Sequence, residues 1–591
     1  MEDARSPAID RALFAVSILL PGCLAASRAL DVADAAHDEA IVRILGLGWT
    51  GAWRALDAVA SATFMVIPLG TRATRAALAS ATICAASGGA LFVAIRALLG
   101  SLAKTPLLGA GIAAIAAATA SLSMAWQLEA SSPGGSVLGA ALAILPVTIA
   151  AAQARNVRST LFPALVFLCA LALSYEPLVG LAAVSSLAIF LGVGQSPLAR
   201  AVIPRSIFGA VLGGVPLAFA LQRRAGTHLT LDAAPLAEWL GERGESPRVS
   251  PVSFLHEQLG WLFLALAAAG LVLGLAPPRG RALTGAFAAW AVIGVAGMAL
   301  GAPAGPSRYG SCALLALAGL ASLASVAMQA LVRWVSEARV PFASASAAMI
   351  LLLELTFPAL AADESQERCD ARPNGASFTW DQEMWGGLAP RSVVMVSEAP
   401  VVRRVMAARA TGELRGDLVF LPLRDLGGRT ALHELAREPL LGPLFRDMTL
   451  SGVPAEFSLS SLASSRPLAM AFQPRWERAL ARHLVAAGGI DRFEPEPRGN
   501  VERKKGLDAF LPARERLAKA LSVPRDGELM VATASLLRAR ALACAASGER
   551  ELLSRALDDL APFAPDDPVA AQLVRRAITP HGSIEVKDLV P

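Results

Sequence analysis

The sequence predicts an α-helical polytopic membrane domain of about eleven spans, followed by an α/β domain with a helical C-terminal tail. Three observations predict this fold class. The 591-residue chain is 54% hydrophobic with a mean hydropathy of +0.52, which is too apolar for an ordinary soluble protein. Apolar segments of membrane-spanning length follow one another as far as residue 361, and beyond residue 362 the composition becomes charged and mixed.

Each apolar segment approaches the roughly 20 residues that a helix needs to cross the hydrocarbon core. Acidic residues offset the basic ones ahead of the first segment, which favours a retained first span over a cleaved signal peptide; cleavage is left open. The segments centre on residues 12–27, 75–95, 106–124, 136–153, 159–174, 177–194, 206–221, 258–276, 283–302, 311–330 and 342–361.

Basic residues predict the orientation of these spans, because among the short loops only every second one carries them in pairs. By the positive-inside rule the paired loops are cytoplasmic. An odd number of spans that starts inside ends outside, so we expect a cytoplasmic N-terminus and an extracytoplasmic C-terminal domain. The pairs are Arg96 with Lys104, Arg155 with Arg158, Arg200 with Arg205, Arg279 with Arg281, and Arg333 with Arg339.

The predicted domains are a membrane domain at 1–362, an α/β domain at 363–512 and a helical, repeat-like tail at 513–591. The membrane domain has two long outer loops, 28–72 and 222–256, and within the first of them an amphipathic helix at 52–69 is expected along the membrane interface. In the α/β domain we expect a linker at 363–387, strands at 392–397, 417–422 and 466–472, and helices at 401–411 and 475–487. The tail is expected to contain a helix pair at 547–559 and 568–577.

Carboxylates in the first outer loop are candidates for a catalytic base. Asp38 and Glu39 follow the first span, at the water side of the bilayer. A base there can deprotonate an acceptor hydroxyl while a cationic group stabilises a leaving phosphate. The alternative is that both side chains are solvated loop charges.

Other polar residues lie at the predicted outer ends of spans, namely Arg75, Arg308, Tyr309, Tyr175 and Glu176. Arginine at this depth can clamp a phosphate. Snorkelling arginines and an interfacial aromatic belt explain the same placement, and both interpretations stay open.

Glu354 is different because it lies inside the last apolar segment. An ionisable side chain there is either functional or a neutral, hydrogen-bonded packing residue.

Cysteine and histidine spacing predicts no metal site, so no cofactor is expected and a role for a divalent metal is left open. Four of the six cysteines fall in predicted spans. The sequence does not decide whether the other two, Cys369 and Cys544, pair. The net charge of +5 is explained by the basic loops, and no basic run is interleaved with aromatic residues, which excludes a nucleic-acid partner.

Several segments resemble, in order, the bacterial multi-spanning family related to protein O-mannosyltransferases, which belongs to the GT-C glycosyltransferases. The resemblance covers residues 30–500. It rests on IPLGTRATRAALASA at 67–81, WQLE at 126–129, SRY at 307–309, RPLA at 466–469 and GGIDRF at 488–493.

The resemblance implies a polyprenyl-phosphate-linked sugar as donor, an acceptor that approaches from outside, and inversion at the sugar carbon. It implies Asp38 or Glu39 as the base and Arg75 and Arg308 as ligands of the donor phosphate. It also places Tyr309, Glu129 and Glu176 in the substrate site. The chain departs from the family where members carry a DSGE motif and an HPPGYP turn, because it has AHDE at 36–39 and WTGAW at 49–53.

The leading prediction is therefore a GT-C-type hexosyltransferase of the bacterial cytoplasmic membrane. It would move a sugar from the lipid-linked donor to an extracytoplasmic protein or glycan of the cell envelope. Because of the departures, a catalytically degenerate relative that acts as a binding or scaffold protein in envelope assembly is the alternative. A transporter, suggested by Glu354, is the third. The sequence does not name the sugar, the acceptor or the oligomeric state.

Overall fold

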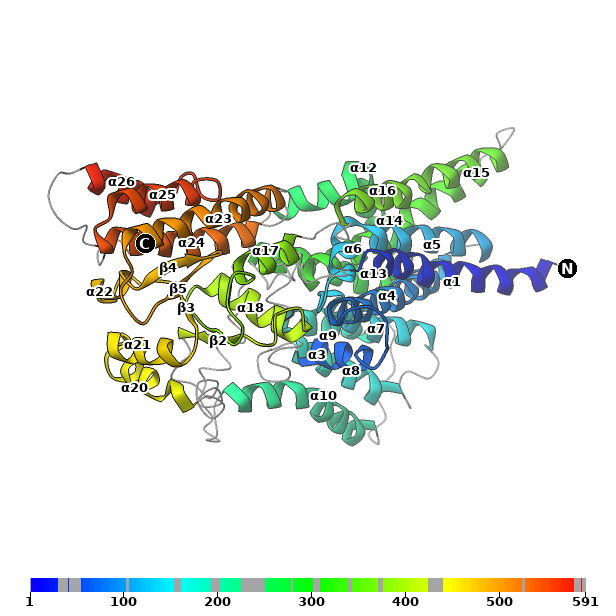
Figure 1. The fold of residues 1–591 in the computed structure, drawn as a ribbon. Helices are drawn as coiled ribbons and strands as arrows, with labels where there is room; N and C mark the ends of the chain where they lie inside the picture. Colours follow the sequence, from blue (N-terminus) through cyan, green and yellow to red (C-terminus); the bar gives the residue numbers. More distant parts are fainter. Residues whose placement is uncertain are drawn as a thin grey trace. The chain divides into compact units, whose positions relative to one another are not determined.

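The structure is a computed structural model, and its contacts divide the chain into two compact units. The N-terminal unit comprises residues 1–31 and 43–373, and the C-terminal unit comprises residues 32–42 and 374–591 (Figure 1). The residues described are 2–29, 41, 55–102, 106–153, 161–192, 202–224, 250–277, 280–300, 309–337, 343–369, 376–423, 439–522, 527–578 and 586.

The described part of the N-terminal unit is built from helices. Each of the eleven apolar segments coincides with a helix, and the last segment is divided between two. The helices are α1 (Glu2–Ser27), α3 (Ala55–Phe64), α4 (Arg72–Leu102), α5 (Pro106–Leu122), α6 (Met124–Ser131), α7 (Val137–Ala152), α8 (Phe162–Tyr175), α9 (Pro177–Gly192), α10 (Ile203–Arg224), α12 (Pro251–Leu275), α13 (Arg281–Leu300), α14 (Ser311–Glu337), α15 (Ala343–Glu354) and α16 (Thr356–Cys369).

Several of these helices are long and apolar enough to cross a membrane, as the sequence predicts. By length and composition α1, α4, α12, α13 and α14 qualify, and so does the pair α5 and α6 if it is one span bent by 62°. Helices α7, α8, α9 and α10 are also apolar, but their apolar stretches are only 10–17 residues long. The chain is thus a membrane protein by these criteria, and the count of eleven spans stays a prediction.

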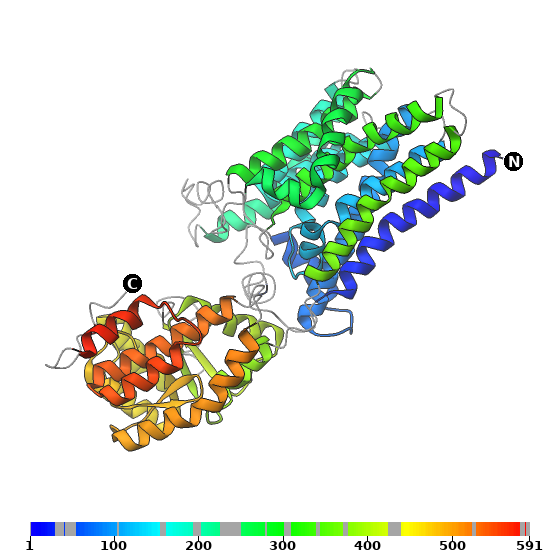
Figure 2. The ribbon, with the colours of Figure 1, turned by 90° about the horizontal axis from the view of Figure 1, so that it is seen from above.

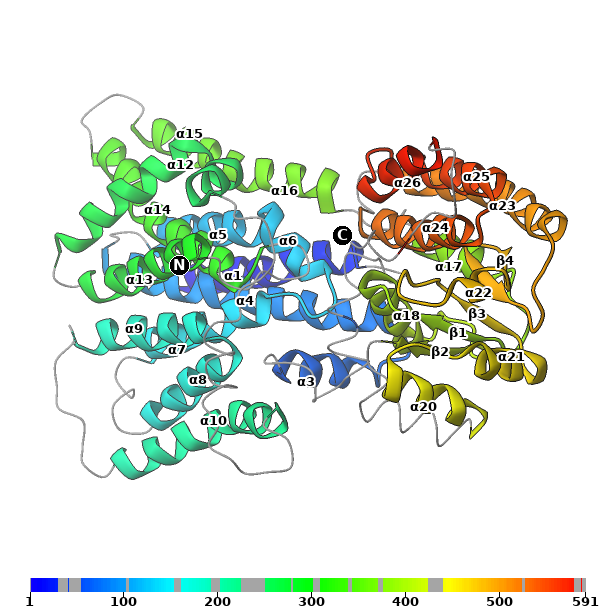
Figure 3. The ribbon, with the colours of Figure 1, turned by 90° about the vertical axis from the view of Figure 1, so that its left-hand side faces the viewer.

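The bundle is organised around α14. Of the apolar stretch of α14, 94% is buried, because α5, α12 and α13 all pack against it. Around this centre α1, the dark blue helix of Figure 2, packs along α4, and α8 packs along α10 (Figure 3). A helix that is apolar on every side and covered on every side is typical of the core of a membrane bundle.

The C-terminal unit is an α/β fold. Its five-stranded sheet has the order β2-β1-β3-β5-β4; β2, β1 and β3 are parallel, whereas β5 is antiparallel to both of its neighbours. The elements are α17 (Ala376–Trp385), β1 (Val393–Val396), α18 (Ala399–Thr411), β2 (Val419–Pro422), the 3-10 turn η7 (Pro439–Leu441), α20 (Gly442–Ser451), α21 (Glu456–Ser465), β3 (Leu468–Met470), α22 (Arg478–Ala481), β4 (Leu484–Ala487), β5 (Ile490–Phe493), α23 (Asn500–Leu521), α24 (Gly527–Ser547), α25 (Arg550–Leu560) and α26 (Pro568–Ile578).

Both faces of the sheet are covered, which explains why its parallel strands are continuous apolar runs. Val393 and Met395 of β1 belong to a core that includes residues of α20 and α21, whereas Val394 and Val396 belong to a core that includes residues of α17 and α18. Helices α23 to α26 lie together on one side of the strands (Figures 1 and 3). Helix α23 runs without a break across residue 512.

Two local expectations are wrong. The expected linker at 363–387 contains the end of α16 and the whole of α17, whose Trp380, Met384 and Trp385 are buried at helical spacing. The expected helix at 475–487 is only the short α22, followed by strand β4. A two-residue Gly488-Gly489 loop turns β4 back into β5, and Gly488 has φ +76°. This dipeptide is a hairpin signal that outweighs the helical spacing before it.

A buried ion pair joins α17 to α18 in this unit. The Arg404 Nη2 donates to Asp381 Oδ2 at 2.5 Å, and the Arg404 side chain is only 1% exposed. We expect Asp381→Asn to lower the free energy of unfolding by about 3–5 kcal/mol, because the guanidinium then loses its nearest buried counter-charge and keeps the longer contact with Glu413 at 3.5 Å. The measurement is the urea midpoint at which the C-terminal unit loses resistance to a brief protease pulse. The control is Asp417→Asn, which removes an exposed ion pair with Arg415 and should shift the midpoint less.

Candidate functional site

At one end of the helical bundle in the N-terminal unit, the starts of some helices lie beside the ends of others. There Arg28, after α1, donates to Ser365 of α16 at 2.9 Å, and Cys369 at the end of α16 donates to the Met124 carbonyl at 3.6 Å. At the opposite end Asp10 of α1 pairs with Arg96 of α4 at 3.3 Å. The first end therefore carries the short loops that lack paired basic residues, which the sequence predicts to be outside.

The segment between α5 and α7 is buried at this end. After α5 the chain bends by 62° into α6, and both α6 and the loop that follows are almost entirely covered. Glu129 of α6 is fully buried, and its Oε2 accepts the backbone N–H of Ser136 at 2.7 Å. Ser136 is the N-cap residue of α7. The carboxylate thus satisfies a donor at a helix N-terminus, where negative charge is favourable.

Ser136 connects this carboxylate to α14. The Ser311 Oγ, in the first turn of α14, donates to the Ser136 carbonyl at 3.2 Å. The neighbouring Cys312 Sγ donates to Glu176 Oε1 at 3.7 Å. Glu176 lies between α8 and α9 and is 3% exposed. The N-terminal ends of α7, α9 and α14 therefore meet around two buried carboxylates.

Tyr175, beside Glu176, extends the cluster to α3. Its hydroxyl donates to both carboxylate oxygens of Asp57, each at 3.2 Å, and both side chains are buried. Close packing at Gly139 of α7 makes room for this tyrosine. A Cβ atom at Gly139 would lie 2.7 Å from Tyr175 Cε1 and 2.3 Å from Ser311 Oγ, so only glycine fits there. We call Asp57, Glu129, Tyr175, Glu176 and Ser311 the carboxylate cluster.

The predicted site residues have different positions. Glu129 and Glu176 are brought into one connected set of contacts. Asp38, Glu39 and Arg308 lie outside the described residues, so their roles stay predictions. Tyr309 is half-buried just before α14, with its ring centroid 5.3 Å from that of Phe254.

Arg75, predicted to bind phosphate, organises the turn between α3 and α4. Its three guanidinium nitrogens donate to the backbone carbonyls of Met65, Leu69 and Gly70 at 3.1–3.2 Å. To reach a phosphate, this guanidinium would have to exchange those partners.

Asp57 is a site residue that the sequence interpretation missed. The segment 52–69 was assigned to the membrane interface on the spacing of its apolar residues. Asp57 is the acidic residue in the first turn of α3, and it lies next to Leu56, which packs against the apolar core. A carboxylate on the apolar face of a short helix was the available signal.

Glu354 is placed apart from the contacts described above. It is the last residue of α15 and is 4% exposed. Neither of its carboxylate oxygens has a hydrogen-bond partner in the described part of the chain. No group of three or more His, Cys, Asp or Glu side chains among the described residues is arranged to hold a metal ion.

Comparisons with known proteins include a distant structural similarity. No protein-family model and no curated protein matches the chain. The crystal structure of ArnT from Cupriavidus metallidurans bound to undecaprenyl phosphate aligns with a TM-score of 0.45 and 15% sequence identity, over 79% of this chain and 92% of that one. This similarity is too distant to assign an activity.

The contact between Tyr175 and Asp57 fixes α3 to the bundle. A hydrogen bond to a charged group stabilises by about 1.5–3 kcal/mol, so Tyr175→Phe should speed hydrogen exchange of the α3 amides roughly 10- to 100-fold. The measurement is hydrogen–deuterium exchange of the purified protein in detergent. Ser185→Ala is the control, because among the described residues the Ser185 hydroxyl bonds within α9, to the carbonyls of Leu181 and Ala182. Unchanged exchange in Tyr175→Phe would contradict the anchoring role.

Proposed function

We propose that the chain is a membrane glycosyltransferase of the GT-C type, which moves a sugar from a polyprenyl-phosphate carrier to a protein or glycan acceptor outside the cytoplasm. In this reaction the acceptor hydroxyl loses its proton to a carboxylate and its oxygen bonds to the anomeric carbon. The bond from that carbon to the phosphate oxygen breaks, and polyprenyl phosphate leaves. The configuration at the sugar carbon is inverted.

The observation that carries this proposal is the carboxylate cluster at one end of an apolar helical bundle. An isoprenoid chain belongs in the hydrocarbon beside such helices, whereas a sugar needs polar partners at the boundary with water. Carboxylates are suited to bind sugar hydroxyls and to accept a proton. In the proposed reaction the cluster would hold the sugar where the lipid and the acceptor meet, and the proton acceptor would come from the first outer loop.

Helix N-termini support a place for the phosphate. The N-terminal ends of α7, α9 and α14 all adjoin the cluster, at Ser136, Glu176 and Ser311. Backbone N–H groups and the positive ends of helix dipoles favour anions. A leaving phosphate at this end of the bundle would gain the same stabilisation that the buried carboxylates now receive.

The proposed roles follow from the predicted residues and the described cluster. Asp38 or Glu39 is the base, and Arg308, with Arg75 after exchange of its carbonyl partners, binds the donor phosphate. Glu129, Glu176 and Tyr309 contact the substrate. Asp57 is a positioning residue, because its bond to Tyr175 anchors the helix that follows the loop containing the base. The protein would lie in the bacterial cytoplasmic membrane, with the C-terminal unit outside.

The test replaces the proposed base. Asp38→Asn together with Glu39→Gln should lower the rate of transfer by about 10²- to 10⁴-fold, the usual contribution of a positioned base. Release of polyprenyl phosphate from a polyprenyl-phosphate-linked hexose in isolated membranes reports the reaction without knowledge of the acceptor. Asp31→Asn, in the same loop, is the control and should retain transfer. Full transfer by a normally abundant double variant would refute this assignment, and no release by the parent chain would favour a scaffold protein.

A transporter is a second candidate, because the Glu354 carboxyl is buried without a hydrogen-bond partner in the described part of the chain. Such a group inside an apolar helix is a site where a proton can bind. In proton-loaded vesicles, Glu354→Gln should abolish coupled uptake if the chain transports. If the chain is a transferase, the same variant should leave polyprenyl-phosphate release unchanged.

A further inference from the structure

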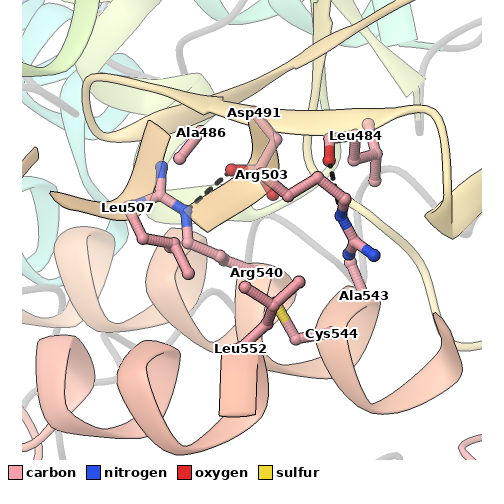
Figure 4. A pocket seen from close by; sticks show the side chains of 9 residues that line it. All are labelled: Leu484, Ala486, Asp491, Arg503, Leu507, Arg540, Ala543, Cys544 and Leu552. Carbon is pink, nitrogen blue, oxygen red and sulfur yellow. Dashed lines mark hydrogen bonds and ion pairs between the residues drawn. The ribbon is translucent and has the colours of Figure 1, made fainter. Parts of the chain in front are cut away.

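A small cavity in the core of the C-terminal unit lies between the β4–β5 hairpin and helices α23 and α24 (Figure 4). The cavity has a volume of about 10 Å³, counted as the space that the centre of a water molecule can occupy. This is room for one water molecule or one monatomic ion. Most of the walls are apolar. The lining residues are Leu484, Ala486, Asp491, Arg503, Leu507, Arg540, Ala543, Cys544 and Leu552.

Two buried arginines line this cavity against one carboxylate. Arg503 is 4% exposed and Arg540 is 2% exposed, whereas Asp491 is the only acidic lining residue. The Arg540 Nε donates to Asp491 Oδ1 at 2.7 Å, and the Arg503 Nε donates to the Leu484 carbonyl at 3.2 Å. The lining side chains therefore carry one more positive charge than negative charge, inside a mostly apolar cavity.

Arg540 is not fully satisfied by its partners. Its Nη2 donates to the Gly488 carbonyl at 2.7 Å, but its Nη1 is buried and has no hydrogen-bond partner among the described residues. The Phe510 ring lies under the guanidinium, 4.8 Å from Cζ. A ring below the plane offsets part of the charge, yet it offers no acceptor to the in-plane hydrogens of Nη1.

Cys544 adds a further donor. Burial raises the pKa of its thiol to about 12, so it stays protonated at neutral pH. The negative charge of nearby Asp559 also raises the pKa of this thiol. Asp559 Oδ1 accepts a hydrogen bond from Arg514 Nη1 at 3.2 Å. Among the lining side chains, two guanidinium groups and a protonated thiol face one carboxylate, which is unfavourable for a cation.

We propose that this cavity binds a monovalent monatomic anion, with chloride as the physiological occupant. A single negative charge offsets the excess positive charge, and its radius suits a space that excludes sulfate and phosphate. Water would supply an acceptor for Nη1 but no charge. The ion would connect α23 and α24 to the hairpin and stabilise the fold of this unit.

The reporter is Cys544 itself, in a full-length protein whose other five cysteines are replaced by alanine. Alkylation of Cys544 by N-ethylmaleimide is followed in detergent while sodium chloride replaces sodium gluconate at constant sodium. We expect the anion to bind only the folded form, in which Cys544 is buried. Alkylation is then slower by the factor 1 + [Cl⁻]/Kd, which is about 100-fold when the chloride concentration is one hundred times Kd.

Variants separate this site from a general salt effect. Arg540→Gln should abolish the dependence on chloride, and Arg503→Gln provides the same test from α23 if the first variant unfolds. Lys504→Gln is the matched control, because Lys504 is adjacent in α23 but pairs with Glu551 at the surface, and it should retain the dependence. Alkylation that ignores chloride in the parent protein, or that still depends on chloride in both arginine variants, would overturn the proposal.

Discussion

The N-terminal unit depends on one constraint: a carboxylate inside an apolar bundle must find hydrogen-bond donors, because no water is available to supply them. Within a helix the backbone donors are already used. Only the first turns have unused N–H groups, so acidic side chains are stable where helices begin. Glu129 of α6 follows this rule, because it accepts the Ser136 N–H at the start of α7. Glu176 accepts from the Cys312 thiol in the first turn of α14. Asp57 receives the Tyr175 hydroxyl instead.

The same constraint explains how much of the fold the sequence predicts. Hydropathy locates the helices of the N-terminal unit, because a membrane bundle has few ways to bury apolar segments of that length. The strand–helix–strand pattern of β1, α18 and β2 was equally accessible, since Val393 to Val396 is an unbroken apolar run. Local signals failed where tertiary packing decided the outcome. Trp380 and Trp385 turn a segment with the composition of a linker into the buried helix α17.

The candidate site was only partly accessible from the sequence. Glu129 and Glu176 could be proposed, because they lie in short loops between apolar segments. Ser136 and Ser311 could not, since a serine at a helix start is too common to single out. Asp57 was missed because its partner Tyr175 is 118 residues away in the chain, and only the folded bundle brings the two together. Contacts of that range carry no local pattern.

The composition of helix α24 is compatible both with a membrane span and with the core of an α/β fold. It passes the same test of length and hydropathy as the spans of the N-terminal unit, yet its residues are covered by the α/β fold. Arg538 and Arg540 occupy its middle, paired with Asp567 and Asp491. In a translocation channel, before any partner has folded, each arginine would cost about 2.5–3.5 kcal/mol to place at the bilayer centre. With the C-terminal unit outside the membrane, as proposed, the two arginines would keep this stretch from inserting laterally into lipid during export.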